Sequence, residues 1–180
     1  DVAEKLSDTK NNQGVFCLCK TLDKNINIGK IKYNGKYIAL EGVSNPANFG
    51  AVVRTAEAVG LDGVIVSGGC DIYNPKALRA SMGALFRMPV HICQNLEEEL
   101  DKCKKMGINT FATVPDRDAK NIVTVDFSKG GMCIIGNEGN GVSKEIIEKC
   151  DDRITIKMDG RAESLNAASA ASIVMWEMAR

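Results

Sequence analysis

The sequence has little of what several common kinds of site require. It contains a single histidine, His91, and no two of its seven cysteines form a Cys-x-x-Cys pair. This argues against a metal centre, because zinc sites draw on closely spaced cysteine and histidine ligands. No apolar run is long enough to cross a bilayer, so we expect no membrane partner. The formal net charge is zero, which counts against a protein that binds nucleic acid by charge alone.

What is present fits one globular domain with a substantial core. The chain has 180 residues, of which 44% are hydrophobic and 26% charged, an ordinary composition for a folded domain of this size. The cysteines are scattered, most of them in apolar runs. This pattern predicts reduced, buried thiols in a cytoplasmic protein, because disulfides are rare in that compartment.

The first 36 residues differ from the rest of the chain. They hold seven lysines against four acidic residues, with asparagine and glycine between them, and only residues 15–19 favour a short strand. We expect residues 1–36 to be a linker or the remnant of a preceding RNA-binding domain, and residues 37–180 to form the main domain. The chain starts without a methionine, which suggests a piece of a longer protein.

From residue 37 onward, short apolar segments alternate with segments of helical periodicity. Near-continuous apolar strands separated by helices predict an α/β fold, with a parallel sheet flanked by helices on both faces. The expected strands are Tyr37–Val43, Gly63–Val66, Val90–Cys93, Asn109–Val114, Met132–Ile135 and Arg153–Ile156. The expected helices are Asn48–Val59, Pro75–Met82, Leu96–Met106, Ser143–Lys149 and Ser164–Ala179.

Three loops that follow strands are rich in glycine, asparagine and charge. They comprise residues 45–50, 136–141 and 158–164. In a parallel sheet the carboxyl ends of the strands share one edge, where ligands gather. The small residues that follow Asn166 let another backbone or a ligand approach the last helix closely. Together these features predict a site built mainly from backbone loops.

Each loop taken alone has a simpler interpretation. Asn48 could cap a helix, Arg54 could be an exposed helical charge, and residues 136–141 could form a plain turn. This last segment is not a phosphate-binding P-loop, because Val142 stands where a lysine would begin, and its glycine spacing differs from the dinucleotide fingerprint. A nucleotide-dependent oxidoreductase is therefore disfavoured. The three loops together, each directly after an apolar strand, favour one shared site.

The loops also resemble the three ordered motifs of the SpoU (TrmH) family of RNA ribose methyltransferases, in the SPOUT superfamily. Residues 74–86 resemble the segment that links the first two motifs, and the resemblance covers roughly residues 38–180. The matching positions are Asn48, Gly50, Arg54, Thr55 and Ala56 in the first motif, Ile135 to Gly139 and Gly141 in the second, and Ile156, Met158, Gly160 and Glu163 to Asn166 in the third.

This resemblance implies a SPOUT fold whose C-terminal segment is threaded as a deep trefoil knot, an exception to ordinary chain topology. It implies transfer of a methyl group from S-adenosylmethionine to a ribose 2′-hydroxyl of RNA. It also implies that backbone groups hold the bent cofactor within the knot. The cofactor-binding residues it points to are Gly136, Asn137, Gly139, Ile156, Met158, Ser164 and Leu165.

By the same resemblance Arg54 is the catalytic arginine. The family proposal makes it a base that is helped by a substrate phosphate, although a guanidinium ordinarily keeps its proton. A second account has Arg54 grip the phosphate and orient the ribose. The other expected catalytic-site residues are Asn48, Glu138, Ser164 and Asn166. Asn48 would orient Arg54 or the substrate, and Glu138 would hold the second loop or pair with an arginine.

Partners and substrate are expectations of the same kind. Ribosomal RNA is favoured over transfer RNA because residues 6–15 resemble the end of the RNA-binding domain of ribosomal RNA-modifying relatives. The resemblance implies a homodimer, with the last helix divided between a core face and a partner face. Arg79 and Arg87 either contact RNA or are solvated charges, and His91 is expected to be structural. The alternative to an enzyme is a catalytically silent RNA-binding or assembly protein of the same fold.

Overall fold

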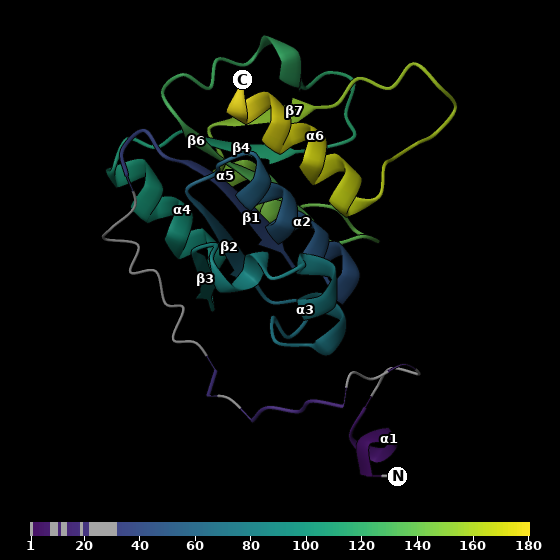
Figure 1. The fold of residues 1–180 in the computed structure, drawn as a ribbon. Helices are drawn as coiled ribbons and strands as arrows, with labels where there is room; N and C mark the ends of the chain where they lie inside the picture. Colours follow the sequence, from purple (N-terminus) through teal and green to yellow (C-terminus); the bar gives the residue numbers. More distant parts are fainter. Residues whose placement is uncertain (1, 8–10, 12–13, 19, 22–31) are drawn as a thin grey trace.

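A single sheet of parallel strands organises the chain (Figure 1). The computed structural model describes residues 2–7, 11, 14–18, 20–21 and 32–180. Within them the sheet has seven strands in the order β3-β2-β1-β6-β4-β7-β5, and every pair of neighbours is parallel. The strands are β1 Lys36–Glu41, β2 Gly63–Ser67, β3 Val90–Cys93, β4 Thr110–Thr113, β5 Lys120–Asn121, β6 Gly131–Ile135 and β7 Asp152–Thr155. The predicted parallel sheet is confirmed.

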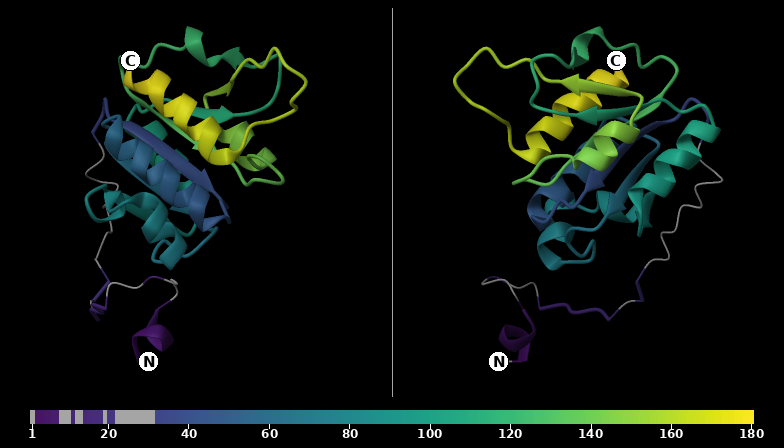
Figure 2. Two further views of the ribbon diagram at one scale, coloured as in Figure 1. Left: turned by 45° about the vertical axis from the view of Figure 1, so that its right-hand side comes forward. Right: turned by 180° about the vertical axis from the view of Figure 1, so that it is seen from behind.

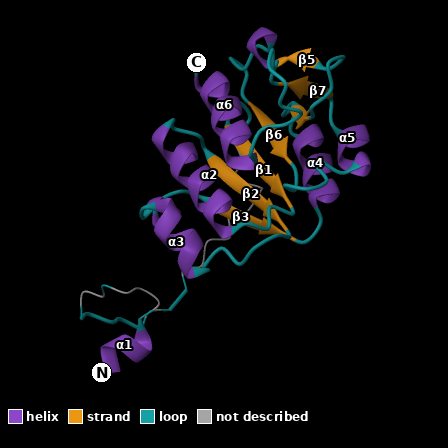
Figure 3. Cartoon of the chain, turned by 90° about the vertical axis from the view of Figure 1, so that its right-hand side faces the viewer, coloured by secondary structure: helices purple, strands orange, loops and turns teal. Residues whose placement is uncertain are grey.

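Helices cover both faces of this sheet (Figures 2 and 3). Helices α2, α3 and α6 lie on one face, and α4 and α5 lie on the other (Figure 3). The helices are α1 Val2–Leu6, α2 Pro46–Ala58, α3 Pro75–Ser81, α4 Leu96–Lys105, α5 Lys144–Lys149 and α6 Ala167–Ala179, with short 3-10 turns η2 Ala84–Phe86 and η3 Ile122–Thr124. The expected α/β architecture is confirmed.

Alternation along the central strands fills two separate cores. In β1, Ile38 and Leu40 belong to the core beneath α2 and α6, whereas Tyr37 and Ala39 belong to the core beneath α4. Strand β6 alternates in the same way. Successive side chains of a strand point to opposite faces, and each fully buried isoleucine or leucine contributes about 1.5–3 kcal/mol. The central strands are therefore apolar in their interiors, although β1 begins at Lys36 and ends at Glu41.

The last helix begins later than its sequence pattern predicts. It was expected from Ser164, but α6 starts at Ala167. The side-chain oxygen of Asn166 accepts hydrogen bonds from the backbone N–H groups of Ala168 and Ser169, at 2.9 and 3.3 Å. Asn166 is therefore the N-cap, and Ser164 belongs to the preceding loop.

The alternative interpretation of Asn48 as a helix cap is wrong, and so is the expected strand over residues 15–18. Helix α2 is capped by Asn45, whose side chain accepts a hydrogen bond from the N–H of Ala47 at 2.9 Å, so Asn48 is a buried helical residue and not a cap. Residues 15–18 form no strand, and Cys19 lies outside the described residues. Within the described ranges no helix combines the length and apolar character that a bilayer crossing needs.

Candidate functional site

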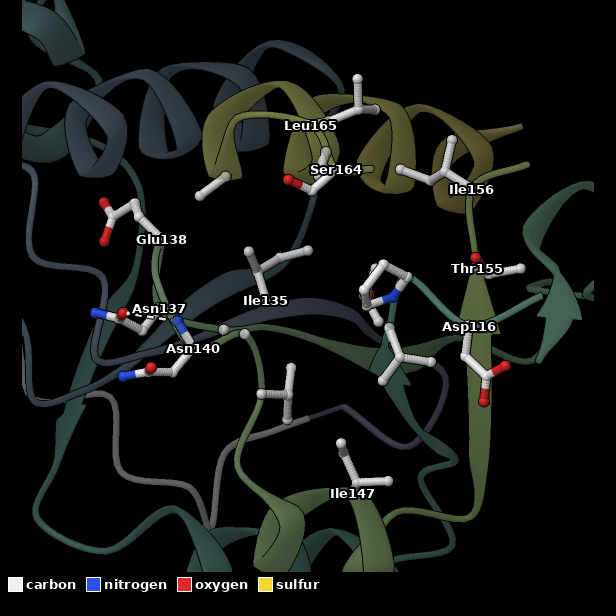
Figure 4. A pocket seen from close by; sticks show the side chains of 18 of the residues that line it. Asp116, Ile135, Asn137, Glu138, Asn140, Ile147, Thr155, Ile156, Ser164 and Leu165 are labelled. Carbon is white, nitrogen blue, oxygen red and sulfur yellow. Dashed lines mark hydrogen bonds between the residues drawn. The ribbon is translucent and has the colours of Figure 1, made fainter. Parts of the chain in front are cut away.

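A cavity of about 550 Å³ lies where three strands end. Its walls come from residues 113–116 at the end of β4, residues 135–142 at the end of β6 and Thr155, Ile156 and Met158 at the end of β7, closed by the loop before α6. In Figure 4, Asn137 and Glu138 lie at one end of the cavity and Asp116 at the other. The volume falls within the ~300–1,000 Å³ typical of small-molecule sites. Parallel strand order has thus gathered loops that are distant in the sequence at one edge of the sheet. Two of the three loops predicted to share a site line this cavity, whereas residues 45–50 do not.

The residues expected to hold a cofactor lie on this wall. Six further lining residues, which the sequence did not predict, complete the sides of the cavity formed by β4 and α5. The expected residues are Gly136, Asn137, Gly139, Ile156, Met158, Ser164 and Leu165. The additional ones are Thr113, Val114, Pro115, Asp116, Lys144 and Ile147. The structure shows that these residues line the cavity, and the role of each in binding a cofactor stays a prediction.

The loop after β6 folds back on itself and leaves no room at its base. Asn137 and Gly141 exchange both backbone hydrogen bonds, at 3.0 and 2.9 Å. The Asn137 side chain donates to the carbonyl of Gly42 at 2.8 Å and accepts from the N–H of Gly139 at 2.8 Å. A Cβ on Gly136 would lie 1.9 Å from the carbonyl carbon of Gly141. The turn is therefore shaped as a rigid wall of the cavity.

Glu138 ties this loop to the segment before α2. Its carboxylate accepts hydrogen bonds from the N–H groups of Ser44 and Asn45, both at 3.1 Å, and from the Asn48 side chain at 2.9 Å. The Asn48 oxygen in turn accepts from the Asn166 side chain at 3.2 Å. One series of hydrogen bonds thus joins residues from all three motifs that resemble those of the family. Among the described residues no arginine lies within ion-pair distance of Glu138, so the expected Glu138–arginine contact is absent there.

These hydrogen bonds keep Glu138 ionised. Partial burial opposes the charged form, but the bonds from Asn48, Ser44 and Asn45 outweigh it and lower the pKa of the Glu138 carboxyl from 4.5 to about 2. Donors that point at a carboxylate stabilise its anion. At neutral pH the carboxylate is therefore a fixed acceptor that holds two loops together.

Arg54 stands apart from this chain of bonds. It lies on α2 beyond Asn48, and its side chain is exposed. Its guanidinium forms neither an ion pair nor a hydrogen bond with any residue of the described part of the chain. Its guanidinium is thus free to bind an anion from solution, and phosphate suits its planar fork of donors.

The residues after β4 were missed because they carry no glycine-rich signature. The Thr113 hydroxyl is buried beside the cavity without a hydrogen-bond partner in the described chain, and Asp116 forms an ion pair with Arg153 at 2.7 Å. Their position in the sequence could have identified them, since Pro115 and Asp116 directly follow a predicted strand, at the same edge of the sheet as the three loops.

The described ranges contain neither a metal-ligand cluster nor a disulfide. No group of three metal-ligating side chains occurs in the described ranges. Six cysteines, all but Cys19, are described there, and each is a free thiol.

The chain matches a known family over most of its length. Residues 35–176 match the SpoU rRNA Methylase family. The chain is 31% identical over 179 residues to a protein of Bacillus subtilis named 23S rRNA (guanosine(2553)-2′-O)-methyltransferase RlmP. The match covers 99% of this chain and 69% of that protein. It is 35% identical over 144 residues to a putative TrmH family tRNA/rRNA methyltransferase of Staphylococcus aureus, covering 79% of this chain and 58% of that one.

Solved structures agree with this match. The SpoU methyltransferase AviRb from Streptomyces viridochromogenes, in complex with the cofactor AdoMet, superposes with a TM-score of 0.80 at 28% identity, covering 89% of this chain and 62% of that one. An AdoMet-bound rRNA methyltransferase from Sinorhizobium meliloti gives 0.78 at 30% identity, covering 86% of this chain and 60% of that one. These relatives are therefore longer than the chain. Family match, sequence identity and fold agree, and the chain belongs to the SpoU rRNA methylase family.

Proposed function

We propose that the chain transfers a methyl group from S-adenosylmethionine to a ribose 2′-hydroxyl of RNA. The observation that carries this proposal is the cavity walled by the second and third motifs and tied through Asn48 to the helix of Arg54. The names of the Bacillus relative and of the AdoMet-bound structures support it. The chain spans less than two thirds of several of these relatives, so the activity of the whole protein is part of the proposal.

The lining of the cavity suits the cofactor. Ile135, Val142, Ile156 and Leu165 offer apolar surface for a flat base. The buried Thr113 hydroxyl lacks a partner in the described chain, and a polar ligand would satisfy it. Backbone N–H and C=O groups of the loops add further polar contacts. When bound, S-adenosylmethionine supplies an electrophilic methyl group on a sulfonium centre.

The residues of the chain then act by positioning. Arg54 binds a phosphate of the RNA next to the target ribose, because it is an unpaired and exposed guanidinium. Asn48, held between Glu138 and Asn166, fixes the first turn of α2 relative to the cavity. Alignment of the 2′-hydroxyl with the methyl group is the main contribution, since orienting two reactants removes a large entropic barrier.

Replacement of Arg54 tests the proposal. We expect Arg54→Ala to bind S-adenosylmethionine as the wild type does, by calorimetry, while methyl transfer to RNA falls by about 100-fold or more. Arg54→Lys keeps the charge without the fork and should retain an intermediate rate. Full activity in Arg54→Ala contradicts the role. No cofactor binding by the wild type favours the silent RNA-binding protein instead.

Ribosomal RNA is the proposed substrate class, ahead of transfer RNA. The Bacillus relative is named for 23S rRNA, whereas the Staphylococcus relative is named for both RNAs. Methyl transfer to separated ribosomal and transfer RNA from a strain lacking the protein decides between them. Transfer RNA as the better acceptor overturns this part.

Threading and dimerisation are proposed from the family resemblance. Helix α6 contacts β1 and β6 of the sheet as well as η3 of the β4–β6 connection, as a helix threaded beneath that connection would, and this supports a knot. On α6, Ile173 and Trp176 are 39% and 60% exposed, which supports a partner face on a homodimer. Sedimentation equilibrium tests the dimer, and a monomer at all concentrations contradicts it.

The remaining assignments rest on the resemblance alone. We propose that residues 1–36 belong to an N-terminal RNA-binding domain of the full protein and that the protein acts in the cytoplasm. Comparing methyl transfer by this chain and by the full-length protein tests the first point, since a domain that binds RNA should lower the KM for RNA without changing affinity for S-adenosylmethionine.

A further inference from the structure

One segment of this chain carries charge of a single sign, although the net charge of the whole is zero. Residues 72–88 include Lys76, Arg79 and Arg87 and no acidic residue. All three cationic side chains are exposed. Neither Lys76 nor Arg79 pairs with an acidic residue in the part of the chain that the structure describes. Two positive charges are thus left without a partner on α3.

Two large apolar side chains are exposed on the same segment. Met82 is 68% and Phe86 54% exposed. An aromatic ring among cationic side chains is typical of surfaces that bind single-stranded nucleic acid, because bases stack on the ring and phosphates bind the cations. Phenylalanine, methionine and arginine are also enriched at protein–protein interfaces, whereas lysine is depleted there. Composition therefore fits both kinds of partner, and it is the position of the segment beside Arg54 that favours RNA.

Close packing brings the segment next to Arg54. Helix α3 lies against α2 at Gly50, where an added Cβ would be 2.4 Å from the carbonyl oxygen of Ala77. Arg54 follows Gly50 by one helical turn. About one further turn along α2, Glu57 holds the Arg87 guanidinium in a bidentate ion pair, with one N–O distance of 2.8 Å. Residues one turn apart on a helix face the same side, so Arg54 and Arg87 border one continuous surface.

We propose that Lys76, Arg79, Met82, Phe86 and Arg87, here called the α3 surface, bind the single-stranded RNA that flanks the methylated nucleotide. The two unpaired cations contact phosphates, and the ring of Phe86 stacks on an unpaired base. A strand that continues from the phosphate at Arg54 would run directly onto this surface. The inference rests on the proposed function, and it names the part of the chain that recognises the substrate.

RNA binding by the 180-residue chain, measured without S-adenosylmethionine, tests the α3 surface separately from catalysis. The probe is an unmodified 23S ribosomal RNA transcript. Phe86→Leu removes the ring face and keeps the apolar bulk, and we expect about fivefold weaker binding or more. Lys76→Gln and Arg79→Gln should each make the dependence of log affinity on log salt shallower by about 0.7.

Matched controls lie on the other face of the sheet. Lys105 is exposed on α4, and Tyr33, 67% exposed, packs beside Gly107 at the end of that helix. Lys105→Gln and Tyr33→Leu should leave RNA binding unchanged, and affinity for S-adenosylmethionine should be unchanged in every variant.

Four results decide whether the α3 surface binds RNA. Weaker binding in the α3-surface variants alone supports the inference. Variants that bind RNA like the wild type overturn it and leave the surface to a protein partner, as does a wild type without measurable RNA binding. If the wild type binds RNA through this surface but transfers no methyl group, the proposed function fails while the α3 surface stands.

Discussion

At the scale of single residues, Gly136 has the least room for change. A Cβ there would lie 1.9 Å from Gly141 and 2.1 Å from the nitrogen of Val142, so Gly136→Ala must open the turn that walls the cavity. We expect this variant to lose S-adenosylmethionine binding by calorimetry. Gly160→Ala is the control, because its Cβ would meet nothing within 4 Å. Equal cofactor affinity in both variants would show that the turn does not shape the site.

The low pKa of Glu138 predicts a dependence of stability on pH. The folded value of about 2 lies below the ordinary 4.5, so the ionised carboxylate stabilises the folded state above pH ~4.5 and loses this effect as the pH falls towards 2. The unfolding free energy of the wild type should exceed that of Glu138→Gln by a constant amount near neutrality. The difference should shrink below pH ~4.5 in urea titrations. A difference that grows with acid contradicts the bonding scheme.

The sequence predicted which residues form the site better than it predicted the contacts between them. Asn48, Glu138 and Asn166 were expected near one another, and the structure joins them in one chain of hydrogen bonds. The Glu138–arginine pair did not appear, because backbone N–H groups of Ser44 and Asn45 already occupy the carboxylate. Sequence patterns name side chains, whereas the competing backbone donors depend on how two loops meet in space.

At the scale of secondary-structure elements, the start of α6 links folding to the site. Asn166 caps this helix and also donates to Asn48. Asn166→Ala should lower the unfolding free energy by about 1 kcal/mol, the usual effect of losing a cap, and should also weaken S-adenosylmethionine binding. Asn95, which caps α4 through Glu97 and Glu98, is the matched control.

The control separates the two effects. Asn95→Ala should cost about the same stability in urea unfolding but leave cofactor affinity unchanged. If both variants weaken cofactor binding equally, general destabilisation and not the position of Asn166 is responsible.

Elements with strong periodicity were predicted, and polar or very short ones were not. The six apolar strands were each expected to within a few residues. Strand β5, Lys120–Asn121, was missed because two polar residues carry no alternation, and it exists only by pairing with β7. The early start predicted for α6 has the opposite cause, since Ser164 and Leu165 are compatible with a helix but the cap at Asn166 sets its first turn.

At the scale of the whole molecule, strand order is what the sequence could not supply. Alternating strands and helices predict a parallel sheet, but not that β6 lies between β1 and β4 with β7 beyond them. That order places the loops after β4, β6 and β7 around one cavity. The family resemblance implied a site at the loops after β6 and β7. The position of residues 113–116 after a predicted strand could have pointed to the third wall, but their place beside the other two loops depends on β4 lying between β6 and β7.

The two cores also predict how the whole molecule responds to alkali. Burial raises the pKa of the Cys103 and Cys150 thiols to about 12, and burial likewise raises the pKa of Cys133. In the unfolded chain these thiols ionise near their ordinary value of 9.0. The unfolded state therefore loses protons first, and the unfolding free energy should fall as the pH rises from about 9 towards 12.

Alkylation checks the same prediction site by site. At pH 8 iodoacetamide should modify the exposed Cys17 quickly, while Cys93, Cys103 and Cys133 should react only as fast as the chain unfolds, because the thiolate is the reactive form and these thiols are buried and neutral. Mass spectrometry of a Cys19→Ser background gives the rates. Addition of urea should raise the alkylation rates of the three slow cysteines together, since they lie in cores that share one sheet. Rapid native modification of Cys133, in the central strand β6, would contradict the packing described for that sheet.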